Sequence, residues 1–155
     1  MKKVLMVCLG NICRSPLAEG ILNSKVAAEF VFVDSAGTAA HHIGELPDYR
    51  SIAVAKKYGI DITNQKARKF MSEDFFEFDF IYAMDKQNYQ NIISLAKNES
   101  EVNKVRLILN EIKPSKDLSV PDPYYGGDDG FENIYQLLTE ACDVIAKKLK
   151  IKNLK

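Results

Sequence analysis

The stretch that organises this chain is residues 4–16, which read VLMVCLGNICRSP. Its four leading residues are apolar and predict a buried strand. Proline is well tolerated at the first helical position, so a helix is expected from Pro16 to about Ala28. Residues Cys8 to Ser15 then form a tight strand-to-helix loop. Such a loop can turn backbone N–H groups inward beside the positive end of the helix dipole, which makes it a candidate anion cradle.

The spacing within this loop predicts chemistry at phosphorus. Five residues separate Cys8 from Arg14, enough chain to wrap once around a tetrahedral oxyanion, so thiol and guanidinium can meet the same phosphate. A thiolate is the nucleophilic form of cysteine, and a helix N-terminus with a nearby cation favours it. Arg14 can bind two oxygens in a bidentate manner, which lysine cannot. Ser15 can donate to the sulfur, and Gly10 and Asn11 suit positive φ angles.

Two other interpretations of the loop are weaker. A nucleotide-binding P-loop needs Gly-Lys-Ser/Thr after its first glycine, and no such triplet follows Gly10. A purely structural interpretation makes Cys8 a buried strand end, Arg14 a surface cation and Ser15 a helix cap. That interpretation explains each residue alone, but not the gathering of Cys, Gly, Asn, Arg, Ser and Pro at one junction.

Two segments of the chain resemble the signatures of a known family. Residues 7–16, VCLGNICRSP, resemble the signature of the low-molecular-weight protein tyrosine phosphatases, and residues 122–126, DPYYG, resemble that family's second signature. The similarity covers nearly the whole chain, including residues 34–37 and 84–85. Two signatures in the family order, over a hundred residues apart, are far more specific than either alone. The resemblance implies hydrolysis of tyrosyl phosphate through a phosphocysteine.

The predicted reaction uses three catalytic residues and no cofactor or metal. The Cys8 thiolate attacks phosphorus, while Arg14 and the loop N–H groups hold the oxygens on which charge gathers. Asp122, flanked by two prolines, protonates the departing phenolate and then activates the water that releases inorganic phosphate. Asp128 and Asp129 are rival carboxylates, interpreted as helix-start or solvated charges. The expected substrate is a phosphotyrosyl protein or a small aryl phosphate.

The resemblance also implies a set of residues that bind substrate. They are Leu9, Gly10, Asn11, Ile12, Cys13, Ser15, His41, Tyr124 and Tyr125. Both tyrosines, with Leu9 and His41 opposite them, are predicted to wall a slot through which a phenyl phosphate reaches Cys8 and phosphoserine does not. The family often has an aromatic residue at the position of His41, and a histidine in the loop network where this chain has Gln65.

Other residues are predicted to support the loop. The resemblance implies that Asn11 and Ser35 pin its backbone. Glu19 either binds Arg14 or is simply a helix-start carboxylate, and Asp85 is favoured as the cap of the following helix over a residue that reaches the site. Cys13 is either a small buried filler or the partner that traps an oxidised Cys8 as a disulfide.

Three rival functions are less consistent with the sequence. A thioredoxin-coupled arsenate reductase resembles the same fold and loop but needs two further cysteines on a later mobile segment, and no cysteine lies between Cys13 and Cys142. A module that only binds phosphoproteins, without turnover, needs neither Cys8 nor Asp122. A phosphocysteine carrier should not need Arg14 together with a hydrolytic acid.

Composition limits the class of protein further. A length of 155 residues predicts one phosphatase domain, 1–155. Lysine plus arginine balances aspartate plus glutamate at 21 each, so neither nucleic-acid binding nor general polyanion binding is expected. Three cysteines are too few and odd in number for a secreted disulfide framework. With no signal-peptide pattern and no membrane span in the sequence, a cytoplasmic location is expected.

Strands and helices alternate along the chain. Strands are predicted at 4–7, 30–37, 79–84 and 105–109, and later helices open at Pro47, after Asp85 and at Gly130. This order predicts an α/β doubly wound domain with a four-stranded parallel sheet and helices on both faces. Ligands of such sheets bind at the carboxyl ends of the strands. Because Cys8, Ser35 and Asp85 lie at or just past such ends, we expect them to converge.

Overall fold

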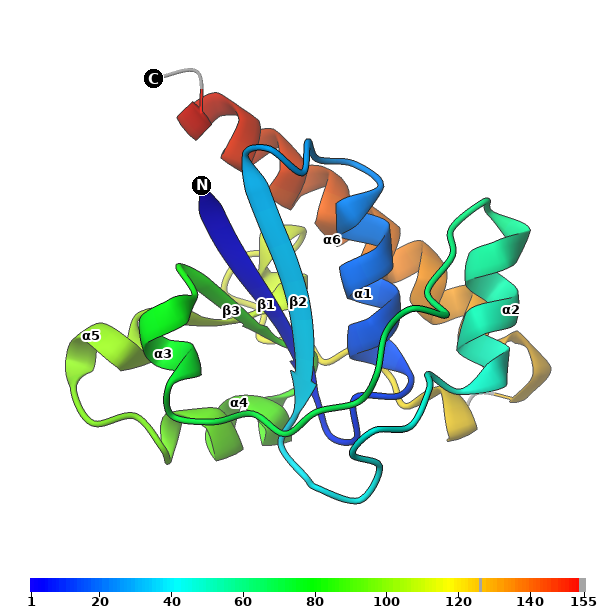
Figure 1. The fold of residues 1–155 in the computed structure, drawn as a ribbon, viewed down its shortest axis with the longest axis horizontal. Helices are drawn as coiled ribbons and strands as arrows, with labels where there is room; N and C mark the ends of the chain where they lie inside the picture. Colours follow the sequence, from blue (N-terminus) through cyan, green and yellow to red (C-terminus); the bar gives the residue numbers. More distant parts are fainter. Residues whose placement is uncertain (126, 154–155) are drawn as a thin grey trace.

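The computed structural model describes residues 1–125 and 127–153, apart from the side chains of residues 125, 128 and 151–153 (Figure 1). It contains one four-stranded sheet whose adjacent strands are all parallel, in the order β2-β1-β3-β4. The strands are β1 (Lys2–Cys8), β2 (Val31–Gly37), β3 (Phe80–Ala83) and β4 (Val105–Leu107). The predicted α/β fold with a four-stranded parallel sheet is therefore confirmed.

The strand order places a switch point beside the end of β1. Leu5 in β1 pairs with Asp34 of β2 on one side and with Ile81 of β3 on the other. The chain leaves β1 for β2, and then crosses to the opposite edge of β1 to form β3. In open α/β sheets, a crevice forms outside the carboxyl ends of the strands where the winding direction changes. The loop after Cys8 starts at this crevice.

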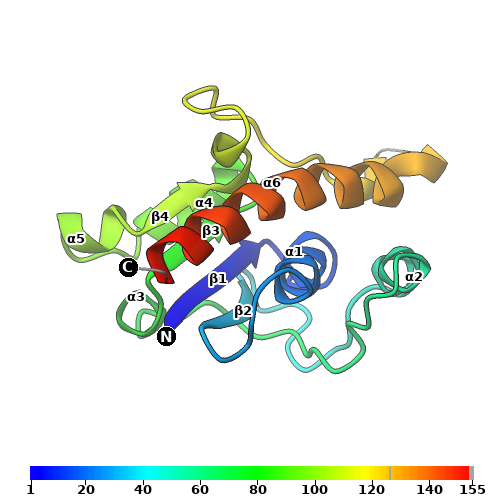
Figure 2. The same ribbon diagram turned by 90° about the horizontal axis from the view of Figure 1, so that it is seen from above.

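Helices cover both faces of the sheet (Figure 2). On one face lie α1 (Arg14–Asn23), α2 (Tyr49–Lys57) and the long α6 (Gly130–Asn153). On the other lie α3 (Asp74–Glu77) and α4 (Lys86–Ile93), and the short α5 (Glu99–Val102) precedes β4. No helix in the described ranges is long and apolar enough to cross a membrane.

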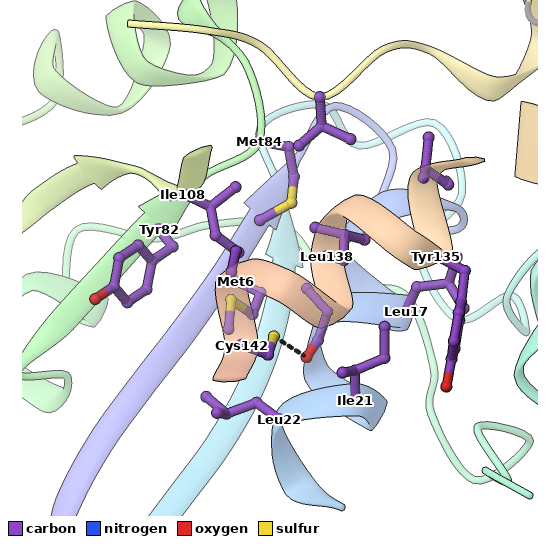
Figure 3. Packing of buried hydrophobic residues seen from close by; sticks show 14 of the residues in the cluster. Met6, Leu17, Ile21, Leu22, Tyr82, Met84, Ile108, Tyr135, Leu138 and Cys142 are labelled. Atoms are coloured by element: carbon purple, nitrogen blue, oxygen red, sulfur yellow. Dashed lines mark hydrogen bonds between the residues drawn. The ribbon is translucent and has the colours of Figure 1, made fainter. Parts of the chain in front are cut away.

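The core explains why β1 is apolar without alternation. Val4 and Met6 belong to the cluster under α1 and α6, whereas Leu5 and Val7 belong to the cluster under α3 and α4. A parallel strand buried on both faces needs apolar residues at successive positions. Figure 3 shows the first cluster, in which Met6 packs with side chains of α1 and α6. Full burial of each large apolar side chain contributes roughly 1.5–3 kcal/mol.

The first helix begins earlier than predicted. It starts at Arg14 with Cys13 at the N-cap, so Pro16 is its third residue rather than its first. Proline is accommodated there because the first four N–H groups of a helix have no intrahelical acceptor. The helix ends at Asn23 rather than near Ala28. At its end, the hydroxyl and the amide of Ser24 donate hydrogen bonds to carbonyls of the last turn. Arg14 and Ser15 therefore lie in the first helical turn.

The last strand is also shorter than predicted. It ends at Leu107, and residues 108–111 form a 3-10 helix instead of continuing to position 109. The reason lies in its neighbour, because Leu107 pairs with Ala83, the final residue of β3. Beyond that pair β3 has no further residue to which β4 could bond.

Candidate active site

The loop between β1 and α1 is closed by backbone hydrogen bonds to the segments that follow β2. The amides of Thr38 and Ala39 donate to the carbonyls of Cys8 and Leu9, both at 2.9 Å. Gly37, at the end of β2, permits this approach, because a Cβ there would lie 2.7 Å from the Leu9 carbonyl oxygen. The loops after β1 and β2 thus meet at one edge of the sheet (Figure 1).

Asn11 is the residue that shapes the loop. Its φ of 58° lies in the left-handed region, as the sequence predicted. Its side-chain amide donates to the hydroxyls of Ser15 (2.8 Å) and Ser35 (2.9 Å), and its side-chain carbonyl accepts from the Arg68 amide (3.0 Å). The positive φ expected at Gly10 is wrong. Gly10 instead provides room, because a Cβ there would lie 3.1 Å from the ring of His42.

The Cys8 sulfur lies between two hydrogen-bonding groups. The Ser15 hydroxyl oxygen is 3.0 Å away, and the Asn11 amide donates to the sulfur at 3.3 Å. Since the Ser15 oxygen already accepts from the Asn11 side chain, its own proton is available to the sulfur. The side chain is buried, with 3% of the residue exposed. This arrangement stabilises negative charge on sulfur, which both a thiolate nucleophile and a thiolate leaving group require.

The Arg14 guanidinium is held by partners from distant parts of the chain. Its Nη1 donates to Asp85 Oδ2 at 2.8 Å and to the Val120 carbonyl oxygen at 2.9 Å. Both bonds come from Nη1, so they fix the plane of the guanidinium without using Nη2. Asp85 also caps α4, where its Oδ1 accepts from the Asn88 amide. The predicted cap is present, and the same carboxylate reaches the site as well.

Both alternatives predicted for Glu19 are wrong, because it does not bind Arg14 and, as the sixth residue of α1, it lies beyond the first helical turn. Its Oε1 accepts from the Ser35 hydroxyl at 2.6 Å. A chain of hydrogen bonds therefore runs from Asn11 through Ser35 to Glu19. Gln65 supports the same helix turn, donating to the Pro16 carbonyl at 3.1 Å. The spacing of residues could not show that Arg14 pairs with Asp85 rather than with Glu19. Glu19 contacts Ser35 near the end of β2, whereas Asp85 follows the end of β3.

The buried position of Glu19 predicts a pH effect on stability. Burial raises the pKa of Glu19 from 4.5 to about 7, against the lowering effect of the Ser35 hydrogen bond. Because the folded state holds this proton more tightly than the unfolded state, the carboxyl destabilises the fold increasingly between these two values. We expect Glu19→Gln to be more stable relative to wild type at pH 8 than at pH 5, by about 2 kcal/mol.

Urea unfolding of both proteins at the two pH values measures this effect. Other titrating groups are common to the two proteins and cancel in the comparison. An equal stability difference at pH 5 and pH 8 would show that folding does not raise the pKa of Glu19.

A cavity of about 280 Å³ joins the loop to the late proline-flanked segment. It is lined by Cys8, Leu9, Gly10, Ile12, Cys13, Arg14, His42, Asp122, Pro123 and Tyr124. A larger cavity of about 750 Å³ lies between α4 and β4, but no residue of the 8–15 loop lines it. The chemistry of the lining therefore identifies the site, and cavity size does not.

The histidine on the cavity wall is His42, not His41. His41 is exposed and does not line the cavity. The ring of His42 lies beside Gly10, so close that a Cβ at position 10 would be 3.1 Å from it. The Nδ1 atom of His42 lies 2.9 Å from Glu45 Oε2. Only one of the two adjacent histidines lines the cavity, and the sequence carries no signal that selects between them.

Asp122 and Tyr124 enter the site from the segment before α6. The Asp122 carboxylate accepts from the Tyr124 amide at 2.9 Å, and both residues line the cavity. The Tyr124 hydroxyl lies 3.6 Å from the Cys13 sulfur, and burial raises the pKa of the Cys13 thiol to about 11. The side chains of Tyr125 and Asp128, and Gly126 of the second signature, lie outside the described residues. Asp129 is exposed and does not line the cavity.

Comparison with known proteins agrees with this geometry. The family model described as low molecular weight phosphotyrosine protein phosphatase matches residues 3–155. The low molecular weight phosphotyrosine protein phosphatase of Schizosaccharomyces pombe is 45% identical over 152 residues, covering 95% of this chain and 96% of that protein. The Homo sapiens protein of the same name is 39% identical over 152 residues and covers 95% of each chain. A crystal structure of a protein tyrosine phosphatase from Entamoeba histolytica superposes with a TM-score of 0.90 at 36% identity, covering 99% of both chains.

Proposed function

This chain belongs to the family of low molecular weight phosphotyrosine protein phosphatases, and from that premise we propose which residues carry out its reaction. It is a cysteine-dependent hydrolase of phosphotyrosine. The observation that carries the proposal is the shared cavity, which Cys8, Arg14 and Asp122 line together. A nucleophile, a guanidinium and a carboxylic acid around one small cavity are the groups that cleavage of a phosphate monoester needs.

Attack on phosphorus begins at Cys8. The thiolate, stabilised by the Ser15 hydroxyl and the Asn11 amide, displaces the phenolate in line and forms a phosphocysteine. Arg14, fixed by Asp85 and Val120, and N–H groups of the loop hold the equatorial oxygens, on which charge gathers in the transition state.

Asp122 acts in both steps. In the first, its carboxylic acid protonates the departing phenolate oxygen, so the tyrosine leaves as a neutral phenol. In the second, the resulting carboxylate takes a proton from water, which attacks the phosphocysteine and releases inorganic phosphate and the Cys8 thiolate. Its exposed position at the cavity mouth suits a group that must first meet the leaving group and then water.

The walls of the cavity favour an aryl substrate. Leu9, Ile12 and Tyr124 offer apolar and aromatic surface above the sulfur, which itself is buried. In this proposal a phenyl ring fits between them and places its phosphate at Cys8. The side chain of phosphoserine is too short to bring its phosphate to the sulfur. We propose a phosphotyrosyl protein or a small aryl phosphate as substrate, with no role for nucleic acid. A turnover panel of phosphotyrosine, phosphoserine, phosphoarginine and acyl phosphates tests this preference.

Substitution of Asp122 tests the two-step reaction. We expect Asp122→Ala to lower kcat for phenyl phosphate by roughly 10²–10⁴-fold, the usual contribution of a general acid or base. Because the second step also loses its base, the phosphocysteine should persist long enough to be detected by mass spectrometry of the quenched enzyme. Asp129→Ala is the matched control, because it removes an exposed carboxylate that does not line the cavity. Unchanged kcat in Asp122→Ala would assign the proton transfer to another group.

We further propose that residues 1–155 act as one phosphatase domain in the cytoplasm. The single-domain proposal is supported by one sheet with a core cluster on each face. The location is supported by chemistry, because a reducing compartment such as the cytoplasm protects a thiolate nucleophile from oxidation. All three cysteines are free thiols in the structure.

A further inference from the structure

The segment that carries Asp122 is tied to a distant helix through one side chain. The Tyr124 hydroxyl donates to Asp48 Oδ2 at 2.7 Å, a contact between residues 76 positions apart. Asp48 is the N-cap of α2, where its Oδ1 accepts from the Arg50 amide at 2.8 Å. The same carboxylate therefore starts a helix and holds a tyrosine of the active-site wall.

Arg50 holds the tyrosine ring from its face. Its Nε and Nη2 donate to the two oxygens of Asp48, each at 3.1 Å. Its guanidinium carbon also lies 4.6 Å from the centre of the Tyr124 ring and 4.8 Å from that of Phe131. A cation over an aromatic face is attracted by the ring quadrupole. Since 49% of Tyr124 is exposed, these contacts hold the ring more than burial does.

The tyrosine in turn holds the carboxylate of the acid. Its backbone amide donates to Asp122 Oδ1 at 2.9 Å. A shift of Tyr124 therefore moves the N–H group that holds the Asp122 carboxylate. Partial burial would raise the pKa of Asp48, but the hydrogen bonds from Arg50 and Tyr124 outweigh it and lower that pKa. Asp48 thus stays an ionised acceptor, which makes the stronger hydrogen bond.

We propose that Asp48 and Arg50 are positioning residues for the general acid, acting on Asp122 through Tyr124. The inference rests on the proposed function, because it assigns a role to residues around the acid of that reaction. Neither residue has to touch the reacting atoms. Their effect is to keep Asp122 where it can reach the leaving oxygen, since proton transfer requires hydrogen-bond distance to that atom.

The leaving group of the substrate separates positioning of the acid from a general structural role. A phenolate is a poor leaving group and needs the proton, whereas 4-nitrophenolate leaves readily without it. A misplaced acid should therefore slow phenyl phosphate far more than 4-nitrophenyl phosphate. A loosened fold or a distorted phosphate loop should slow both substrates equally and weaken competitive inhibition by inorganic phosphate.

Two substitutions and their combination test the proposal. Asp48→Ser keeps an N-cap residue for α2 but is too short to reach Tyr124. Tyr124→Phe keeps the ring over Arg50 and removes only the hydroxyl. We expect each to lower kcat/KM for phenyl phosphate by about tenfold, the order of one hydrogen bond to a charged group, and that for 4-nitrophenyl phosphate by less than about twofold. Because both act through the same contact, the double variant should lose no more than Asp48→Ser alone.

Controls make every outcome decisive. Asp143→Asn, which breaks an ion pair of α6 with Lys25, should leave both substrates unaffected. Equal losses for the two substrates, or additive losses in the double variant, would overturn the positioning role. Failure of the proposed function would be seen separately. Either the wild-type protein would not hydrolyse the aryl phosphates, or a variant that lacks Cys8 would still do so.

Discussion

Cys8→Ser is expected to lower turnover of an aryl phosphate by about 10⁴-fold or more, the scale on which removal of a covalent nucleophile acts. A serine hydroxyl at this position is not ionised by two hydrogen bonds of the kind that stabilise the thiolate. The cradle itself should remain, because the Arg14 contacts do not involve the sulfur and a serine oxygen can still accept from the Asn11 amide. Steady-state kinetics with phenyl phosphate, together with the inhibition constant of inorganic phosphate, measure the two effects separately.

Cys142→Ala provides the matched control for this substitution. Cys142 is a buried thiol of α6, and its sulfur faces the Ala18 carbonyl rather than the cavity. That variant should keep its kcat even if removal of the sulfur costs about 1 kcal/mol of stability. Full activity in Cys8→Ser would refute a covalent mechanism through this cysteine.

Arg14→Lys is expected to lower kcat by roughly 10²–10³-fold, the loss that follows removal of a donor from a preorganised oxyanion site. Lysine keeps the positive charge but has no planar fork. A single ammonium cannot bond Asp85 and the Val120 carbonyl and also hold two phosphate oxygens. The loss should fall mainly on kcat, because the charge on the equatorial oxygens is greatest in the transition state.

An exposed arginine offers the comparison for this prediction. Arg106, in β4, stacks on Phe80 at 5.3 Å and lies outside the cavity, so Arg106→Lys should stay within about twofold of wild type. If Arg14→Lys were equally active, charge alone would suffice at this position. The bidentate geometry would then have no role in the reaction.

Local patterns in the sequence predicted the centre of the molecule well. The apolar run 4–7 indicated a buried strand, which the structure buries on both faces, and the positive φ of Asn11 followed from the residue types of the loop. The contact of Ser15 with the sulfur was also predicted, because Cys8 and Ser15 are the two ends of the same short loop. Such features depend on sterics and hydrogen bonds among near neighbours, which the order of residues carries directly.

Pairings between distant segments were beyond the sequence. Glu19 and Asp85 were both available to Arg14, and only the packing of the strand ends placed Asp85 beside the guanidinium and Glu19 beside Ser35. Choosing His42 over His41, or linking Tyr124 to Asp48, needed the same information.

The amino-acid order by itself indicated the strand, the candidate anion-binding loop and the helix that follows, since their signals are an apolar run, turn-forming residues and Pro16 within a few positions of one another. Tertiary structure alone decided which carboxylate holds Arg14, which histidine lines the cavity and which helix steadies the segment of Asp122. The physical reason is distance along the chain. Several chemically equivalent side chains compete for each long-range contact, and the strand ends that converge at the sheet edge select among them.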